Sequence, residues 1–150
     1  MSIFPTKILL ATDGSKDAEL ALTTAVDLTN ATNSELHVVT IAHGYPAYDL
    51  RDPAVVEQLR QQGEEVLEEQ VRKIEEAGGK VAEKHLRVPE HHRAQEIVEV
   101  AEEAGAGLIV MGSRGLGGMR RALMGSVSDS VVRHAHCPVM VVRYERERAA

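Results

Sequence analysis

A glycine-rich stretch at residues 112–126 has the composition and the surroundings of an anion-binding loop. It follows the apolar run 108–111, which predicts a buried parallel strand, and it precedes a helical pattern that begins at Ser126. Glycine permits positive φ angles and lets a ligand touch the backbone. The free N–H groups at the start of a helix attract anions, most often phosphate. The stretch therefore predicts a phosphate site, with a surface loop that binds no ligand as the alternative.

The rest of the chain alternates short apolar runs with amphipathic runs, which predicts β and α elements in turn. The expected strands are residues 7–11, 35–42, 80–88, 107–111 and 138–142. The expected helices run from Ser15 to about Asn30, from Pro53 to the glycines at 78 and 79, over 94–104 and over 126–135. The first helix is expected to turn Leu20, Ala21, Ala25 and Leu28 to the core, and a loop is expected over 43–52. The strand at 80–88 alternates and is expected to be peripheral, with Val81, Glu83, His85 and Arg87 on one face. In the last helix, Val127, Val131 and Val132 suit one face.

This alternation predicts a single α/β domain over residues 1–150, with its core at about 5–143 and a charged tail at 144–150. We expect a doubly wound, Rossmann-like parallel sheet of order 3-2-1-4-5 with helices on both faces. Its topological switch point lies between strands 1 and 4. Asp13 follows strand 1 and the glycine stretch follows strand 4, so both are expected at one crevice.

Composition narrows the class of protein. The formal net charge of −6 argues against nucleic acid or an anionic membrane as the main partner. No apolar run approaches the length of a membrane span, and the first residues lack the apolar region of a signal peptide. We therefore expect a cytoplasmic protein. The single cysteine, Cys137, excludes an internal disulfide and is expected to pack at the end of the last helix.

Three common phosphate sites do not fit this sequence. The loop after strand 1 offers only Gly14, so the GxGxxG fingerprint of NAD or FAD binding is missing. No GxxxxGK[ST] motif is present, which excludes a P-loop lysine. A phosphoacceptor domain needs a pair of acids after strand 1 and an aspartate after strand 3, and the segments 12–14 and 88–90 do not supply them.

Several segments resemble the universal stress protein family. They are Ala-Thr-Asp-Gly-Ser at 11–15, Met-Gly-Ser-Arg-Gly at 111–115, Gly-Ser-Val-Ser at 125–128 and His-Ala-His-Cys-Pro-Val at 134–139. The resemblance extends over residues 7–143. The nucleotide motif of that family, G-x2-G-x9-G-[S/T], is matched by Gly112, Gly115, Gly125 and Ser126.

The resemblance implies an ATP-binding regulatory or stress-response protein that works as a homodimer. Asp13 would lie near the ribose, the phosphates or their Mg²⁺, and Ile41 would contact adenine through its backbone. The other residues that the resemblance assigns would line the pocket, wrap the ribose or bind the phosphates: Ala11, Thr12, Met111, Gly112, Arg114, Gly115, Gly125, Ser126, Val127 and Ser128.

The residues leave other functions open. The same pocket would serve a slow Mg²⁺-dependent ATPase, although a lysine at the phosphates and a clear base are missing. It would also serve an interaction module that binds AMP or another adenylate. A separate alternative is that Asp13 only caps the first helix or stabilises a turn. A zinc site among His85, His91 and His92, or His134 and His136, is a further alternative.

The last predicted strand suggests how two copies would associate. Val139, Met140, Val141 and Val142 would leave an apolar strand at the sheet edge. Unprotected edges of this kind pair with another chain, and pairing with the same strand of a second copy closes a twofold dimer. The family resemblance implies the same interface.

Overall fold

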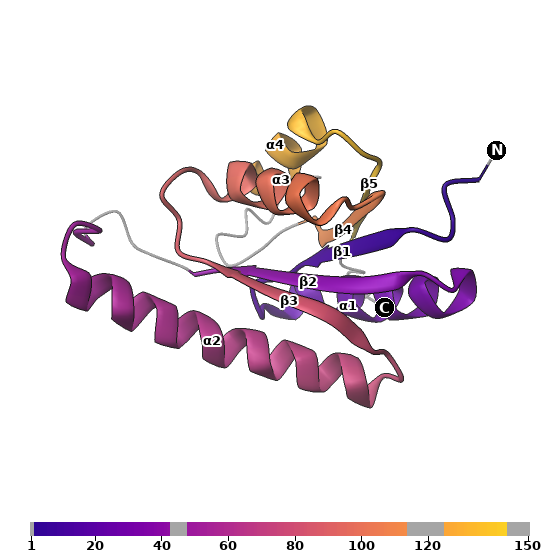
Figure 1. Ribbon diagram of the computed structural model, residues 1–150, viewed down its shortest axis with the longest axis horizontal. Helices are drawn as coiled ribbons and strands as arrows, with labels where there is room; N and C mark the ends of the chain where they lie inside the picture. Colours follow the sequence, from indigo (N-terminus) through magenta and orange to yellow (C-terminus); the bar gives the residue numbers. More distant parts are fainter. Residues whose placement is uncertain (1, 43–47, 114–124, 144–150) are drawn as a thin grey trace, which may run out of the picture.

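The computed structural model describes residues 2–42, 48–113 and 125–143, and these form a parallel sheet with helices on both faces (Figure 1). The strands are β1 (Lys7–Ala11), β2 (Glu35–Ile41), β3 (Val81–Arg87), β4 (Leu108–Gly112) and β5 (Val139–Val142). The helices are α1 (Lys16–Thr32), α2 (Pro53–Glu76), α3 (Arg93–Ala104) and α4 (Ser126–His134). The five strands lie in the order β3-β2-β1-β4-β5, which confirms the predicted fold class and topology.

The central strand β1 is buried on both of its faces. Ile8 and Leu10 belong to a core shared with α1 and α2, whereas Leu9 and Ala11 belong to a second core shared with α3 and α4. Figure 1 shows α1 and α2 below the sheet and α3 and α4 above it. A continuous apolar run in a central strand is expected when both faces of a parallel sheet are covered.

Helix α1 turns a different stripe to the sheet from the one predicted. Leu20 is 41% exposed, so its predicted place in the core is wrong. The stripe is set by residues spaced three or four apart, and Leu20 lies about 200° around the helix from Ala18. The buried residues of α1 are Ala18, Ala21, Leu22, Ala25, Val26 and Thr29.

Strand β3 is peripheral, as predicted, but it does not alternate regularly. Its register against β2 shifts between Leu36 and His37, so that Leu36 pairs with Val81 while His37 pairs with Glu83. Val81 packs against the core on the α1 and α2 side, and Glu83 approaches His37 on the opposite face. The predicted placement of Val81 on one face with Glu83 is therefore wrong.

Helix α4 begins at Ser126, as predicted, with Gly125 as its N-cap residue. Val131 is fully buried, but Val132 is 45% exposed, so only part of the predicted valine face reaches the core. Among the described residues, no helix is both long and apolar enough to cross a membrane. The charged tail at 144–150 and part of the predicted loop after β2, residues 43–47, lie outside the described residues.

Candidate functional site

The carboxyl ends of β1, β2 and β4 are neighbours in the sheet. Ala11 pairs with Met111 on one side and with Val39 on the other. Beyond the end of β1, the Thr12 backbone N–H donates to the carbonyl of Val39 at 3.0 Å. Ala11, Ile41 and Met111 are all buried at this edge. The sheet thus brings the segment before Asp13 next to the strand that leads into the glycine-rich stretch.

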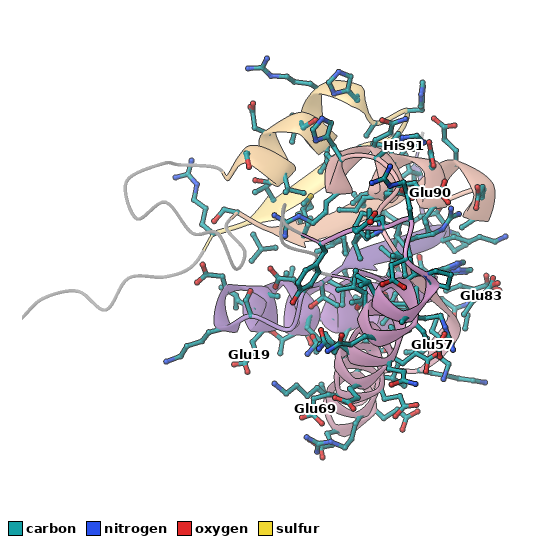
Figure 2. All side chains as sticks on the ribbon, turned by 90° about the vertical axis from the view of Figure 1, so that its left-hand side faces the viewer. Glu19, Glu57, Glu69, Glu83, Glu90 and His91 are labelled. Atoms are coloured by element: carbon teal, nitrogen blue, oxygen red, sulfur yellow. The ribbon has the colours of Figure 1, made fainter. Side chains whose placement is uncertain are left out.

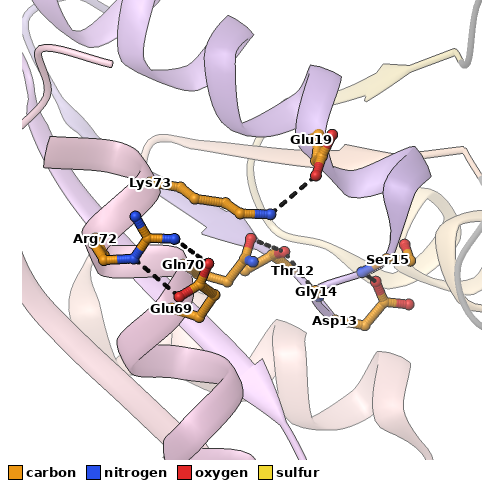
Figure 3. A network of polar contacts seen from close by, with 9 residues as sticks. All are labelled: Thr12, Asp13, Gly14, Ser15, Glu19, Glu69, Gln70, Arg72 and Lys73. Carbon is orange, nitrogen blue, oxygen red and sulfur yellow. Dashed lines mark hydrogen bonds and ion pairs between the residues drawn. The ribbon is translucent and has the colours of Figure 1, made fainter. Parts of the chain in front are cut away.

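Asp13 lies in a tight turn between β1 and α1 (Figure 3). Its Oδ1 atom accepts a hydrogen bond from the Ser15 backbone N–H at 2.9 Å, and Gly14 has a φ of 76°. Ser15 is the N-cap residue of α1, as predicted, but its side chain makes no capping hydrogen bond. The Ser15 Oγ atom is buried without a hydrogen-bond partner among the described residues. A buried hydroxyl of this kind can bind a polar ligand.

A second contact connects this turn to α2. The Thr12 hydroxyl donates to Gln70 Oε1 at 2.9 Å, and the Gly14 N–H donates to Thr12 Oγ1 at 3.3 Å. Gln70 is buried, and Figure 3 shows its side chain directed from α2 toward Thr12. A Cβ atom at Gly14 would lie 3.0 Å from Val66 Cγ1, so α2 also limits the space behind the turn. The contact with Gln70 was missed from the sequence.

The start of α4 is positioned by Ser113, a buried residue just beyond β4. The Ser113 carbonyl accepts from the Gly125 N–H and from the Ser128 hydroxyl, the latter at 3.0 Å. The Ser113 N–H donates to Val142 of β5 at 2.9 Å. Ser113 therefore connects β4, β5 and α4. The Ser128 hydroxyl has a structural partner, and its predicted contact with phosphate stays a prediction.

The N-terminus of α4 offers backbone donors. Gly125 has no side chain that can cap the helix. The first N–H groups of a helix have no partner within it and bind caps, water or ligands. In α4 these groups belong to Ser126, Val127 and Ser128. The predicted contributions of Arg114 and Gly115 lie outside the described residues.

The cysteine and the histidines are placed differently from one another. Cys137 packs against the core on the α3 and α4 side, as predicted, and burial raises the pKa of its thiol. Burial lowers the pKa of His85. His91 and His92 are exposed, and the ring that approaches His85 belongs to His37 of β2. His37 was not among the histidines considered from the sequence.

These features define a doubly wound α/β domain in which a carboxylate and uncapped helix N-termini follow the central strands. The sequence profile of the universal stress protein family matches residues 5–143. A universal stress protein of Methanocaldococcus jannaschii, MJ0531, is 36% identical over 143 residues, which cover 91% of this chain and 81% of that protein. The chain belongs to the universal stress protein family.

Solved structures of the same family have the same architecture. A universal stress protein in complex with cAMP aligns with a TM-score of 0.69 at 25% identity, covering 95% of this chain and 99% of that one. A universal stress protein from Archaeoglobus fulgidus in complex with dAMP aligns with a TM-score of 0.63 at 25% identity, covering 93% and 98%. Some structural neighbours of this chain therefore bind adenine nucleotides.

Proposed function

We propose that this chain is a cytoplasmic, homodimeric regulatory protein that binds ATP at the carboxyl ends of β1 and β4. The main support is that the Asp13 turn and the described residues of the nucleotide motif lie at the ends of two neighbouring strands, β1 and β4. Gly112 ends β4, Gly125 and Ser126 begin α4, and Ala11 of β1 is paired with Met111. Backbone N–H groups at a helix start bind phosphate oxygens without a lysine.

The residues present fit a nucleoside triphosphate with Mg²⁺. The α4 N–H groups would bind phosphate oxygens, and the buried Ser15 hydroxyl would find a polar partner. Mg²⁺ in proteins is often held by one or two carboxylates together with substrate phosphates and water. Asp13 would supply a carboxylate, and the metal would neutralise charge on the phosphates. The backbone of Ile41 would contact adenine at the end of β2.

A charge-removing substitution at Asp13 tests the role of Mg²⁺. Asp13→Asn keeps a side-chain oxygen that can accept from the Ser15 N–H but removes the negative charge. We expect calorimetric titration to show about tenfold weaker binding of Mg-ATP, with little change for AMP. Asp27→Asn, an exposed change on α1, is the matched control. Equal losses for Mg-ATP and AMP would instead assign Asp13 to the ribose or to the turn.

A monophosphate ligand is a second candidate, because structural neighbours are in complex with cAMP and dAMP. A competition series with ATP, ADP, AMP and cAMP separates the two. An affinity that increases with the number of phosphates supports ATP. Equal or stronger binding of the monophosphates supports an adenylate module.

Slow hydrolysis of bound ATP is the remaining alternative. Efficient phosphoryl transfer requires a group that orients the nucleophile and cations at the phosphates. Phosphate release by purified protein, compared with a Gly125→Val variant purified in the same way, distinguishes intrinsic turnover from a contaminant. Release that is equal in both proteins would exclude hydrolysis at this site.

The homodimer is proposed from the edge strand β5. Sheet order places β5 at one edge, with β4 as its neighbour. The strand contains Val139, Met140, Val141 and Val142, and Met140 is 37% exposed. Antiparallel pairing of two β5 strands would satisfy their outer backbone groups and cover this apolar side chain.

A further inference from the structure

Two histidines and a glutamate on β2 and β3 lie close together at the edge of the sheet opposite β5. His37 Nδ1 lies 3.4 Å from His85 Nε2 and 3.8 Å from Glu83 Oε2. One ligand atom from each of the three side chains lies within 4.8 Å of the others. His37 and His85 are 48 residues apart in the sequence, and the parallel pairing of the two strands brings them together.

The register shift in β3 creates this cluster. Leu36 pairs with Val81, but the next residue of β2, His37, pairs with Glu83, so Ala82 is the extra residue. In a regular strand Val81 and Glu83 would lie on the same face. Because of the shift, Val81 packs against the core while the Glu83 carboxylate lies beside His37. Bulges redirect side chains in this way and occur often beside functional sites.

Neither ring nitrogen of His37 has a hydrogen bond of good geometry among the described residues. The residue is 4% exposed, and its Nε2 atom is buried with no hydrogen-bond partner in the part of the chain that the structure describes. The 3.4 Å between the two ring nitrogens exceeds the about 2.7–3.2 Å of a good hydrogen bond. Glu35 Oε2 lies 3.6 Å from His37 Nε2, on the side of the ring away from His85. A small movement of the exposed Glu35 side chain would let it accept from Nε2.

We propose that His37 Nδ1, His85 Nε2 and the Glu83 carboxylate bind a divalent transition metal of the Zn²⁺ type. Tetrahedral bonds of about 2.0–2.1 Å place two ligand nitrogens about 3.3–3.4 Å apart, which matches the separation of the two rings. The Glu83 side chain is 64% exposed, so it can move closer, and water can take the fourth position. Figure 2 shows Glu83 projecting at the periphery of the molecule.

The surroundings favour a cation at this position. Metal-bound histidines usually donate their second N–H to a carboxylate, and Glu35 is positioned to accept it from His37 Nε2. Arg87, the next residue of β3 on the His85 face, is paired with Glu103 and lies 3.9 Å from Glu96 Oε2. Its positive charge is thus offset by two carboxylates. The metal site is separate from the proposed nucleotide site and does not depend on it.

Titration of tag-free, nucleotide-free protein with ZnCl₂ tests the proposal. We expect saturable binding of about one Zn²⁺ per chain in calorimetry. Co²⁺ in place of Zn²⁺ should give the intense visible absorption of a low-coordination site. Zn²⁺ binding that is absent, or that never saturates, would overturn the proposal.

Single substitutions test which side chains bind the metal. Glu35→Gln is expected to weaken Zn²⁺ binding about tenfold, as for an outer partner, and His85→Ala and Glu83→Gln should weaken it more. His134→Ala removes an exposed imidazole on α4 and is the matched control. Circular dichroism verifies that each variant is folded. An unchanged affinity in folded His85→Ala, or an equal loss in His134→Ala, would overturn the assignment. Gly125→Val should leave Zn²⁺ binding intact, which separates this test from that of the nucleotide site.

Discussion

The two edges of the sheet differ in composition and in what covers them. The edge strand β3 contains Glu83, Lys84, His85 and Arg87, and on one face Leu86 packs under the long helix α2. The other edge strand, β5, consists of one methionine and three valines. Charged side chains on an edge strand oppose pairing with another chain, and an uncharged apolar edge permits it. This difference agrees with the two proposals made above, a metal ion at the β3 edge and self-association at the β5 edge.

The largest expected effect is at the β5 edge. Met140→Lys places a charge on its exposed apolar side chain, and we expect a dimer of the wild-type protein to become a monomer. Light scattering coupled to gel filtration measures the mass. Lys84→Gln on β3 is the control and should leave the mass unchanged. A wild-type monomer, or an unaffected Met140→Lys dimer, would refute the proposed use of this edge.

A smaller effect is expected where α2 covers β3. A Cβ atom at Gly63 would lie 2.7 Å from Leu86 Cδ1 and 3.3 Å from the Ala42 Cβ. Gly63→Val should overpack this contact and lower the free energy of unfolding by about 2 kcal/mol. Urea unfolding measures the change, with the exposed Gln62→Val as control. Equal stabilities of the two variants would show that the helix is not closely packed here.

The connection from β3 to α3 should show a still smaller effect. Glu96 is 3% exposed, and its Oε1 atom accepts from the N–H groups of Glu90 and His91. Figure 2 places Glu90 and His91 beside the α3 end of the molecule. Glu96→Ala should cost about 1 kcal/mol of unfolding free energy, because water reaches this exposed loop and replaces part of the lost bonding. Glu96→Gln, which retains an acceptor, should recover much of the loss; no recovery would indicate that the charge matters.

The smallest effect concerns Cys137, which lies two positions before β5. Burial raises the pKa of the Cys137 thiol, so the folded protein holds less reactive thiolate than the unfolded chain below that pKa. Alkylation by iodoacetamide at pH 8, followed by mass spectrometry, should be slower in buffer than in urea. The native rate should increase with pH. Cys137 is the only cysteine, so the signal is unambiguous. Equal rates would contradict its packing against the core.

The regular alternation of apolar runs and helical periods was sufficient to predict a parallel sheet, and right-handed crossovers with short loops predicted its strand order. The sequence also predicted that Asp13 and Gly112 lie close together, because the carboxyl ends of neighbouring parallel strands lie at the same end of the sheet. It did not show the contact of Thr12 with Gln70, which lie 58 residues apart. Such contacts depend on how far α2 extends over the sheet.

The register of β3 against β2 was a second feature that could not be predicted from the sequence. Alternation predicted Val81 and Glu83 on one face, and the extra residue in β3 separates them. The meeting of His37 with His85 follows from that pairing and has no local signal. Leu20 shows the same limit on a helix, because an apolar residue outside the buried stripe stays exposed.

The central claim is that the chain binds ATP at the carboxyl ends of β1 and β4, which lie between the two edge strands of the sheet. Titration of nucleotide-free protein with Mg-ATP, for the wild type and for Gly125→Val, tests it directly. Gly125 has a φ of −72°, which valine adopts readily, so the variant should fold while its side chain fills the approach to the α4 N–H groups. We predict saturable binding near one ATP per wild-type chain and none by the variant. Equal binding by both proteins, or none by folded wild type, would contradict the proposed site.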